Sequence, residues 1–177
     1  ILGLLPDKSG YKDGKAGFYD IGATLSHTFN VRNKLNIYGY YSRDRFAFNE
    51  NEKYGYGNMN VSAHWRSFFS EKLIGNFSVG YDHYDYLNDE TTVPSQAARL
   101  SFSINQYFAK ANFSLNQEKH KLKFGAFTLF YNISSGKYEP LGKESVVAFD
   151  ELQKDKALES AFYLDDEWEV TPKLSLN

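Results

Sequence analysis

Histidine is the first residue type to test for chemistry, because imidazole serves as a general base and as a metal ligand near neutral pH. The chain has four histidines, His27, His64, His83 and His120, and they stand far apart in the sequence. No pair has the spacing of a zinc-binding motif, and the chain contains no cysteine. We therefore expect neither a metal site nor a cofactor, and we favour the interpretation that the histidines line a lumen or an interface.

Nucleophilic catalysis would need a serine beside a base and an acid. Ser62 and His64 are two residues apart, so both would lie on one side of an extended strand, but the sequence places no acid beside them. The chain also lacks a G-x-S-x-G elbow, a P-loop and a dinucleotide-binding glycine motif. We predict that the chain is not an enzyme.

Acidic residues gather at two expected loop tips, 49–52 and 89–90, where oxygen ligands could attract calcium. Their spacing does not match an EF-hand, so solvated loop charge is the preferred interpretation. Lys and Arg number 20 against 22 Asp and Glu, and the net charge is −2. This balance gives no reason to expect nucleic acid as a partner.

The elements that must position these residues are long strands with apolar or aromatic residues at every second position. Aromatic residues make up 18% of the chain and hydrophobic residues 42%, and the mean hydropathy is −0.54. No run of about 18 apolar residues is present, which argues against a helical membrane protein. A transmembrane β-barrel accommodates this polarity, because only alternate residues of its strands face lipid.

The alternating pattern predicts seven to eight antiparallel strands. They cover residues 18–29, 35–48, 53–69, 73–87, 97 to the turn at 117, 121–133, 158–170, and a last strand that begins at 174. In the fifth strand the apolar residues move from even positions, up to Ile104, to odd positions, from Ala109. Because side chains alternate with a period of two, we predict a β-bulge between Asn105 and Phe108.

The connections alternate in length. Those at 70–72 and 171–173 are short, whereas the one at 88–95 is longer and charged. In an outer-membrane barrel the short turns lie in the periplasm and the long loops lie outside the cell. The whole chain is therefore predicted to be part of a single transmembrane β-barrel domain.

Two segments are predicted as long loops. Residues 1–16 are rich in Gly, Lys and Asp, and residues 134–156 form the longest polar connection, which we expect to be extracellular. In or beside this second loop, Tyr131, Tyr138 and Phe149 are candidates for substrate contact, because exposed aromatic rings can grip the flat face of a ligand.

Aromatic residues are expected to form girdles where the strands cross the membrane surfaces. The candidates near the short turns are Phe29, Trp65, Phe69 and Trp168, and those near the long loops are Tyr54, Tyr56, Tyr84 and Tyr86. The alternative is a soluble β-sandwich with an aromatic core, which would need strands of only about five or six residues.

Three stretches carry a resemblance to a known family. Residues 157–168 (ALESAFYLDDEW), followed by 171–177 (TPKLSLN), resemble a barrel hairpin of TonB-dependent receptors. Residues 110–113 (KANF) and 119–126 (KHKLKFGA) resemble another hairpin of that family, and 138–141 (YEPL) fits the loop that follows it. The chain looks most similar to receptors that carry a carboxypeptidase-regulatory-like domain ahead of the plug.

The resemblance implies a larger, 22-stranded barrel with an N-terminal plug and a motif that contacts TonB. The plug and the end of the barrel are not found in this chain, so we expect a fragment of a longer protein. The resemblance also implies a polar lumen face that meets the plug, and its candidate residues are Tyr163, Asp165, Glu167 and Glu169. Asp166, by contrast, falls on the apolar side between Leu164 and Trp168, which suggests a position at the membrane interface.

The function expected from this resemblance is import of a bulky nutrient, such as a metal chelate, an oligosaccharide or a peptide, across the bacterial outer membrane. The expected partners are outer-membrane lipid, TonB acting through the plug, and a surface lipoprotein. The alternative is a self-contained eight-stranded outer-membrane barrel with a structural or adhesive role. We do not expect the isolated chain to be a stable monomer in water, because its sheet would have unpaired edges.

Overall fold

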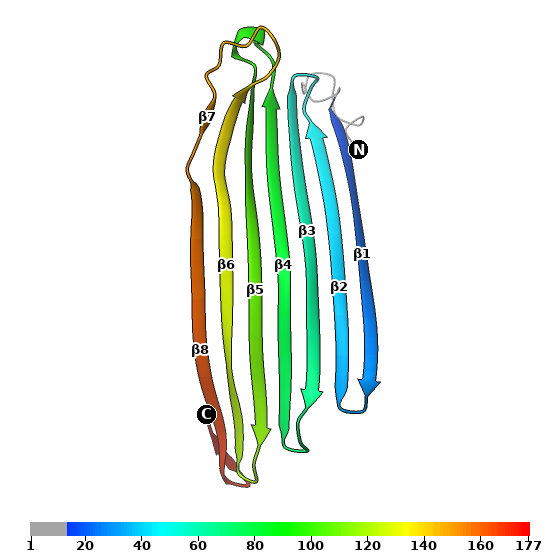
Figure 1. Ribbon diagram of the computed structural model, residues 1–177, viewed down its shortest axis with the longest axis vertical. Helices are drawn as coiled ribbons and strands as arrows, with labels where there is room; N and C mark the ends of the chain where they lie inside the picture. The colour runs from blue at the N-terminus through cyan, green and yellow to red at the C-terminus, as the bar shows by residue number, and fades with distance from the viewer. Residues whose placement is uncertain (1–13) are drawn as a thin grey trace.

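A single antiparallel β-sheet makes up the computed structural model, which describes residues 14–177 (Figure 1). Its elements are β1 (Lys15–Asn30), β2 (Asn33–Ala47), β3 (Glu52–Phe68), β4 (Leu73–Glu90), the 3-10 helix η3 (Pro94–Gln96), β5 (Ala98–Asn116), β6 (His120–Pro140), β7 (Asp150–Glu151), β8 (Lys154–Thr171) and β9 (Leu174–Leu176). The sheet order is β1-β2-β3-β4-β5-β6-β8-β9, and the short β7 pairs with β6. Each long strand therefore pairs with the long strands that precede and follow it in the sequence.

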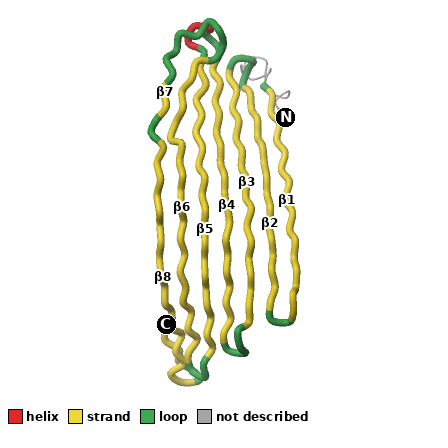
Figure 2. The backbone as a smooth tube through the Cα atoms, viewed as in Figure 1, coloured by secondary structure: helices red, strands yellow, loops and turns green. Residues whose placement is uncertain are grey.

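The predicted all-β antiparallel fold is confirmed, and β1 to β5 begin and end close to their predicted bounds, whereas β6 and β8 extend further than predicted. Tight turns join the strands at one end of the sheet and longer loops join them at the other (Figure 2). Of the predicted loop at 1–16, residues 1–13 lie outside the described part of the chain, and Lys15 and Ala16 already belong to β1. Among residues 14–177, no helix is long and apolar enough to cross a membrane.

The predicted loop at 134–156 is shorter than expected. β6 continues to Pro140, β7 pairs with Lys137 and Tyr138, and β8 begins at Lys154. The sequence suggested a loop because the segment is polar on both faces. A strand that is polar on both faces can still keep its ladder of backbone hydrogen bonds, as the pairing of β6 with β5 and β7 shows.

The β-bulge predicted between Asn105 and Phe108 is absent, because β5 pairs with β4 without interruption from Ala98 to Leu115. A bulge does occur higher in the sheet, between β5 and β6. There Ser101 pairs with Lys137 whereas Ser103 pairs with Ser134, so β6 carries one extra residue. The shift of apolar residues in β5 consequently needs another explanation, which the two faces of the sheet provide.

The register defines two faces, here called face A and face B. Face A carries the odd-numbered residues of β1 to β5 and, in the paired region up to Ser134, the even-numbered residues of β6 and β8. Towards the short turns, face A is apolar and face B polar. Towards the long loops this is reversed, so the apolar residues of β5 change from odd to even positions without any change in pairing.

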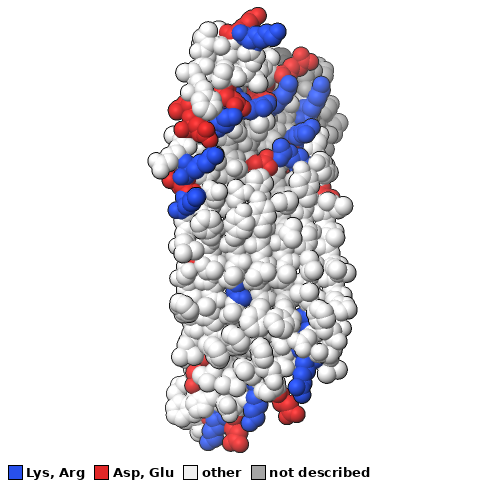
Figure 3. Space-filling model, viewed as in Figure 1, with Lys and Arg blue, Asp and Glu red and all other residues white. Residues whose placement is uncertain are grey.

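The sheet has no core of its own. Among residues 14–177, no large side chain is fully buried, and the buried apolar residues are Ala97 and Ala98. The face drawn in Figure 3 shows charged side chains gathered towards the two ends of the sheet, with a nearly uncharged band between them. A single layer of this kind must bury its apolar surface against something other than its own chain.

Candidate functional site

The main candidate site is an apolar band on the short-turn half of face A. Its large members are Ile21, Leu25, Leu35, Ile37, Tyr41, Met59, Val61, Trp65, Leu73, Phe77, Val79, Tyr81, Tyr107, Phe113, Leu115, Leu122, Phe124, Phe130, Leu158, Phe162 and Leu164. Many of these side chains are exposed, with Val79 at 56%, Leu164 at 75% and Phe162 at 86% of their full accessibility. The band spans nine residues in β4, from Leu73 to Tyr81, and crosses all the long strands.

Aromatic rings pack together at the short-turn edge of the band. Trp65 stacks on Phe77 with ring centroids 5.2 Å apart, and Phe113 stacks on Phe124 at 5.1 Å. The predicted girdle residue Phe69 joins this cluster, 6.3 Å from the rings of both Phe77 and Phe113. The predicted girdle residue Phe29 contacts the ring of His27 at 4.5 Å.

Trp168, the remaining girdle candidate, lies at the same end of the sheet and stacks on His120 at 5.8 Å. Asp166 lies one step above it on face A, and its Oδ2 is 2.8 Å from Nδ1 of His120. The other oxygen of Asp166 is buried and, among the described residues, has no hydrogen-bond partner. The carboxylate therefore lies at the edge of the band, beside a ring nitrogen that can compensate its charge.

The opposite edge of the band carries a row of tyrosines that sequence reasoning missed. Tyr81 and Tyr107 are cross-strand neighbours with rings 4.9 Å apart, and Tyr19 lies 6.0 Å from Tyr41. Each of them is the last large aromatic residue before its strand becomes polar on face A. That change in alternation was present in the sequence and could have identified them.

The tyrosines expected to form a second girdle, Tyr54, Tyr56, Tyr84 and Tyr86, have even numbers and lie on face B, opposite the face that carries the apolar band. Their role as a girdle stays a prediction. On face B, Tyr56, Tyr84, Tyr86 and Phe102 form a continuous group, here called the aromatic shelf. Its ring centroids are 4.8 Å apart for Tyr86 and Phe102, 5.4 Å for Tyr56 and Tyr86, and 5.9 Å for Tyr84 and Phe102.

Tyr54 lies on face B beside the aromatic shelf and outside the apolar band. Its hydroxyl donates a hydrogen bond to Glu52, and this bond raises the pKa of Tyr54 to about 12. Its ring also contacts Phe48 edge-on at 5.6 Å. Face B thus carries aromatic side chains over β2 to β5 near the long loops.

The short-turn half of face B is polar and closely hydrogen-bonded. His64 Nδ1 lies 2.8 Å from Ser78 Oγ on the next strand, so the structure joins His64 to Ser78 instead of Ser62. Asn60 also donates to the carboxylate of Asp82. Among residues 14–177, no group of three His, Cys, Asp or Glu side chains lies close enough together to hold a metal ion.

The predicted lumen residues Tyr163, Asp165 and Glu167 lie on this polar part of face B. Lys123 Nζ is 3.6 Å from Asp165, and Lys121 Nζ is 3.1 Å from Glu167. The two carboxylates are therefore already paired with lysines of β6. The hydroxyl of Tyr163 donates to Asn112 at 3.0 Å, and the side chain of Glu169 is exposed.

The three substrate-contact candidates do not form one cluster. Tyr131 and Tyr138 both lie on face B of β6, where Tyr131 pairs with Gln106 and Tyr138 with Leu100. Phe149 lies in the loop before β7 and is 57% exposed, with the Nζ of Lys137 5.7 Å from its ring centroid. No ring contact joins these residues in the described structure, so their roles stay predictions.

Comparison with known proteins supports the fold. No protein-family model and no curated protein matches the sequence. The structure is similar to that of BauA, the ferric preacinetobactin receptor from Acinetobacter baumannii, with a TM-score of 0.60 and a sequence identity of 12%. The match covers 90% of this chain and 32% of the BauA chain, so this chain spans about a third of that receptor. At this identity the similarity concerns the fold alone: the sheet matches a portion of the receptor.

Proposed function

We propose that this chain forms part of the wall of a bacterial outer-membrane β-barrel, in a TonB-dependent transporter that imports a bulky nutrient. The observation that carries the proposal is the apolar band on face A, in a sheet whose described residues provide no core to cover it. Soluble proteins rarely leave so large an apolar surface exposed. Lipid on face A and a polar lumen on face B would account for the opposite character of the two faces.

The dimensions of the band agree with this proposal. Nine residues at about 3.3 Å each extend roughly 30 Å along a strand. With the strand tilt of about 40° that is usual in such barrels, this length spans roughly 23 Å, close to the height of about 25 Å of their apolar zone. Lipid as the occupant of face A therefore requires no adjustment of the strands.

The accessibility of attached spin labels to oxygen and to a nickel complex tests which face meets lipid. Cysteines introduced singly into the full-length protein at Val79, Asn76 and Leu87 would be labelled in lipid vesicles. Val79 lies in the band on face A, Asn76 on face B, and Leu87 on face A beyond the band. We expect oxygen to increase the relaxation rate of the label at 79. A water-soluble nickel complex should increase the relaxation rates of the labels at 76 and 87. Equal exposure of all three labels to the nickel complex would refute the membrane wall.

The aromatic shelf is the best candidate for ligand contact. Its rings face the proposed lumen beyond the apolar band, where an incoming ligand would meet the wall first. Stacked tyrosines offer flat apolar surfaces with hydroxyl groups at their edges, which suits the rings of an oligosaccharide or an aromatic metal chelate. Tyr131 and Tyr138 on the same face could extend this surface.

Transport is tested separately, in a strain that lacks the full-length gene. The strain would receive the wild-type gene or the Tyr86→Ala variant and be supplied with ferric chelates, maltooligosaccharides or peptides as the limiting nutrient. We expect the wild type to restore growth on one of these classes, only while the proton gradient is intact, and Tyr86→Ala to lower uptake at least about tenfold. A Tyr86→Phe variant keeps the ring and should retain most of the uptake. Growth independent of the gene on all three classes would contradict the import function.

A further inference from the structure

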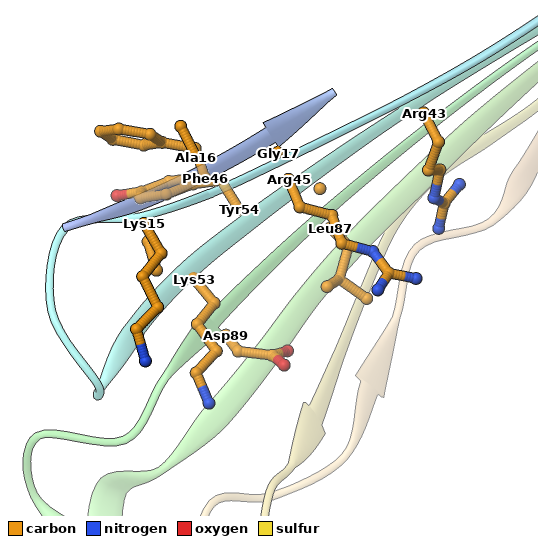
Figure 4. Close-up of a pocket in the computed structure, with 12 residues that line it drawn as sticks. Lys15, Ala16, Gly17, Arg43, Arg45, Phe46, Lys53, Tyr54, Leu87 and Asp89 are labelled. Carbon is orange, nitrogen blue, oxygen red and sulfur yellow. The ribbon is translucent and has the colours of Figure 1, made fainter. Parts of the chain in front are cut away.

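A basic groove lies on face A directly beyond the apolar band. Its volume is about 610 Å³, and its lining comes from β1 to β4 (Figure 4). Lys15, Arg43, Arg45 and Lys53 line it together with Leu87 and Asp89. In Figure 4, the long side chains of Lys15, Arg43, Arg45 and Lys53 extend to the same side of the sheet.

Three of these cations have no acidic partner. Among residues 14–177, no carboxylate lies within ion-pair distance of Lys15, Arg45 or Lys53. The two acids that β4 places on this part of face A are already paired, and Glu50, which lines an adjoining hollow with Lys15 and Lys53, forms no ion pair with them among the described residues. Arg43 binds Asp85 at 2.5 Å, and Arg99 binds Asp89 through two hydrogen bonds of 2.7 and 2.8 Å. Within the described part of the chain, the groove therefore presents three positive charges that have no ion-pair partner.

Glycines keep the floor of the groove open. Gly17, Arg45, Gly55 and Leu87 form one cross-strand row, so Arg45 has a glycine on each side. A Cβ at position 17 would meet nothing within 4 Å, and one at position 55 would touch Leu87 at 3.8 Å. The space beside the guanidinium group of Arg45 is thus left free for a ligand.

The depth of the groove relative to the band indicates which kind of ligand reaches it. Arg45 lies four residues beyond Tyr41, which closes the band on β2, so it stands roughly 13 Å further along the strand. Tyrosines mark the boundary between hydrocarbon and head groups in membrane proteins. A cation just beyond such a boundary lies at the depth of the lipid head groups.

We propose that this groove binds the phosphorylated head group of an outer-leaflet lipid. The inference rests on the membrane placement proposed above and adds a specific lipid site to it. Arg45, Lys53 and Lys15 would hold the phosphate oxygens through charge-assisted hydrogen bonds. A neutral head group would leave the three charges without a partner.

Lipid binding by the full-length protein in non-ionic detergent tests this proposal. The probes are bis-phosphorylated lipid A, its dephosphorylated form and inorganic phosphate, and native mass spectrometry counts the bound lipid. The test variant is Lys15→Gln, Arg45→Gln and Lys53→Gln combined. The matched control is Lys34→Gln, Arg66→Gln and Lys110→Gln combined, which removes the same number of charges from face B.

We expect the test variant to bind bis-phosphorylated lipid A roughly 100-fold more weakly, about fivefold for each lost charge, whereas the control binds like the wild type. Equal binding by the test variant would overturn the proposal. So would equal binding of the dephosphorylated lipid, or full displacement by inorganic phosphate at a matched concentration, which would indicate a site for the free anion.

Failure of this inference can be told apart from failure of the proposed function. Flotation of the wild-type protein with lipid vesicles reports membrane insertion alone. If the wild type floats but binds both lipid forms equally, only the proposed head-group site is refuted. If the wild type stays monodisperse in water without detergent, both the proposed membrane wall and the lipid site are refuted.

Discussion

The two halves of each long strand differ in which face is apolar. On the short-turn half of β4, Phe77 and Val79 on face A are apolar, and Asn76 and Ser78 on face B are polar. On the long-loop half, Asp85 lies on face A, and Tyr84 and Tyr86 lie on face B. The backbone pairing is continuous between the two halves. The alternation of side chains thus fixes which residues share a face, while the residue types in each half determine which face is apolar.

A charge in the apolar band should have the largest effect. Val79→Arg places a guanidinium near the middle of the band on face A, and we expect it to lower the free energy of unfolding by about 2–4 kcal/mol. The matched variant Ser101→Arg lies on face A beyond the band and should cost less than about 1 kcal/mol. Urea unfolding of the full-length protein in lipid vesicles measures both. Equal costs would mean that the two halves meet the same medium.

The aromatic shelf should be the next most sensitive feature. Tyr86→Ala removes ring contacts with Phe102 and Tyr56, and we expect a loss of about 2 kcal/mol in the free energy of unfolding. Tyr86→Phe keeps the ring and should cost less than about 0.5 kcal/mol. The same unfolding experiment compares them. If the alanine variant is as stable as the phenylalanine variant, the ring contacts of Tyr86 do not contribute to the free energy of unfolding.

Gly57 tests the boundary between the halves on face A. Its missing side chain lets the Arg43–Asp85 ion pair cross β3, and a Cβ there would collide with both partners. Gly57→Ala should therefore cost about 1 kcal/mol. Gly39 lies inside the band with nothing within 4 Å of a Cβ, so Gly39→Ala should be neutral or slightly stabilising. The reverse order of stability would show that the ion pair does not cross over Gly57.

The smallest effect concerns Tyr54 on the long-loop half. Its hydrogen bond to Glu52 raises the pKa of the phenol from 10.0 to about 12, because the neutral form donates the bond. The resulting stabilisation is fully present below pH 10 and is lost as the pH rises from about 10 to about 12. Glu52→Ala should lower the pKa towards 10, whereas Glu50→Ala should leave it unchanged. Carbon-13 NMR of labelled tyrosine follows this titration, and an unchanged pKa in Glu52→Ala would exclude the hydrogen bond as the cause.

Most of the fold was predictable from the sequence, because alternation and turn residues are local signals. The bounds of β1 to β5, the tight turns and the polar side of β8 with Asp165 and Glu167 were predicted directly, whereas β6 and β8 extend into the predicted loop at 134–156. The prediction of a bulge at 105–108 was wrong, because a shift in the apolar pattern of a strand can arise in two ways. The strand can carry an extra residue, or its apolar residues can change from one face of the sheet to the other. A single strand cannot distinguish them, whereas the same shift in several paired strands at one level can.

The candidate site was less predictable, since it depends on cross-strand register. The basic groove joins Lys15, Arg45 and Lys53 from three strands, and nothing local in the sequence indicates that they meet. The aromatic shelf shows the same dependence, because the sequence predicts how far along their strand Tyr84 and Tyr86 lie but not which cross-strand rings they meet. In sheets of this kind, register must be known before side chains can be grouped into sites.

The order of the strands has a consequence for assembly. From β2 to β8, every long strand pairs with the long strand before it in the chain, so a hairpin can be added with only short loops to close. Each addition leaves a fresh row of unpaired backbone groups like the one it covered. The exposed strand edge is therefore similar after every hairpin, and the repeat itself does not determine the number of strands. In the barrel proposed above, the circumference would be set by the meeting of two edges, which would make closure a single late event instead of a property of any hairpin.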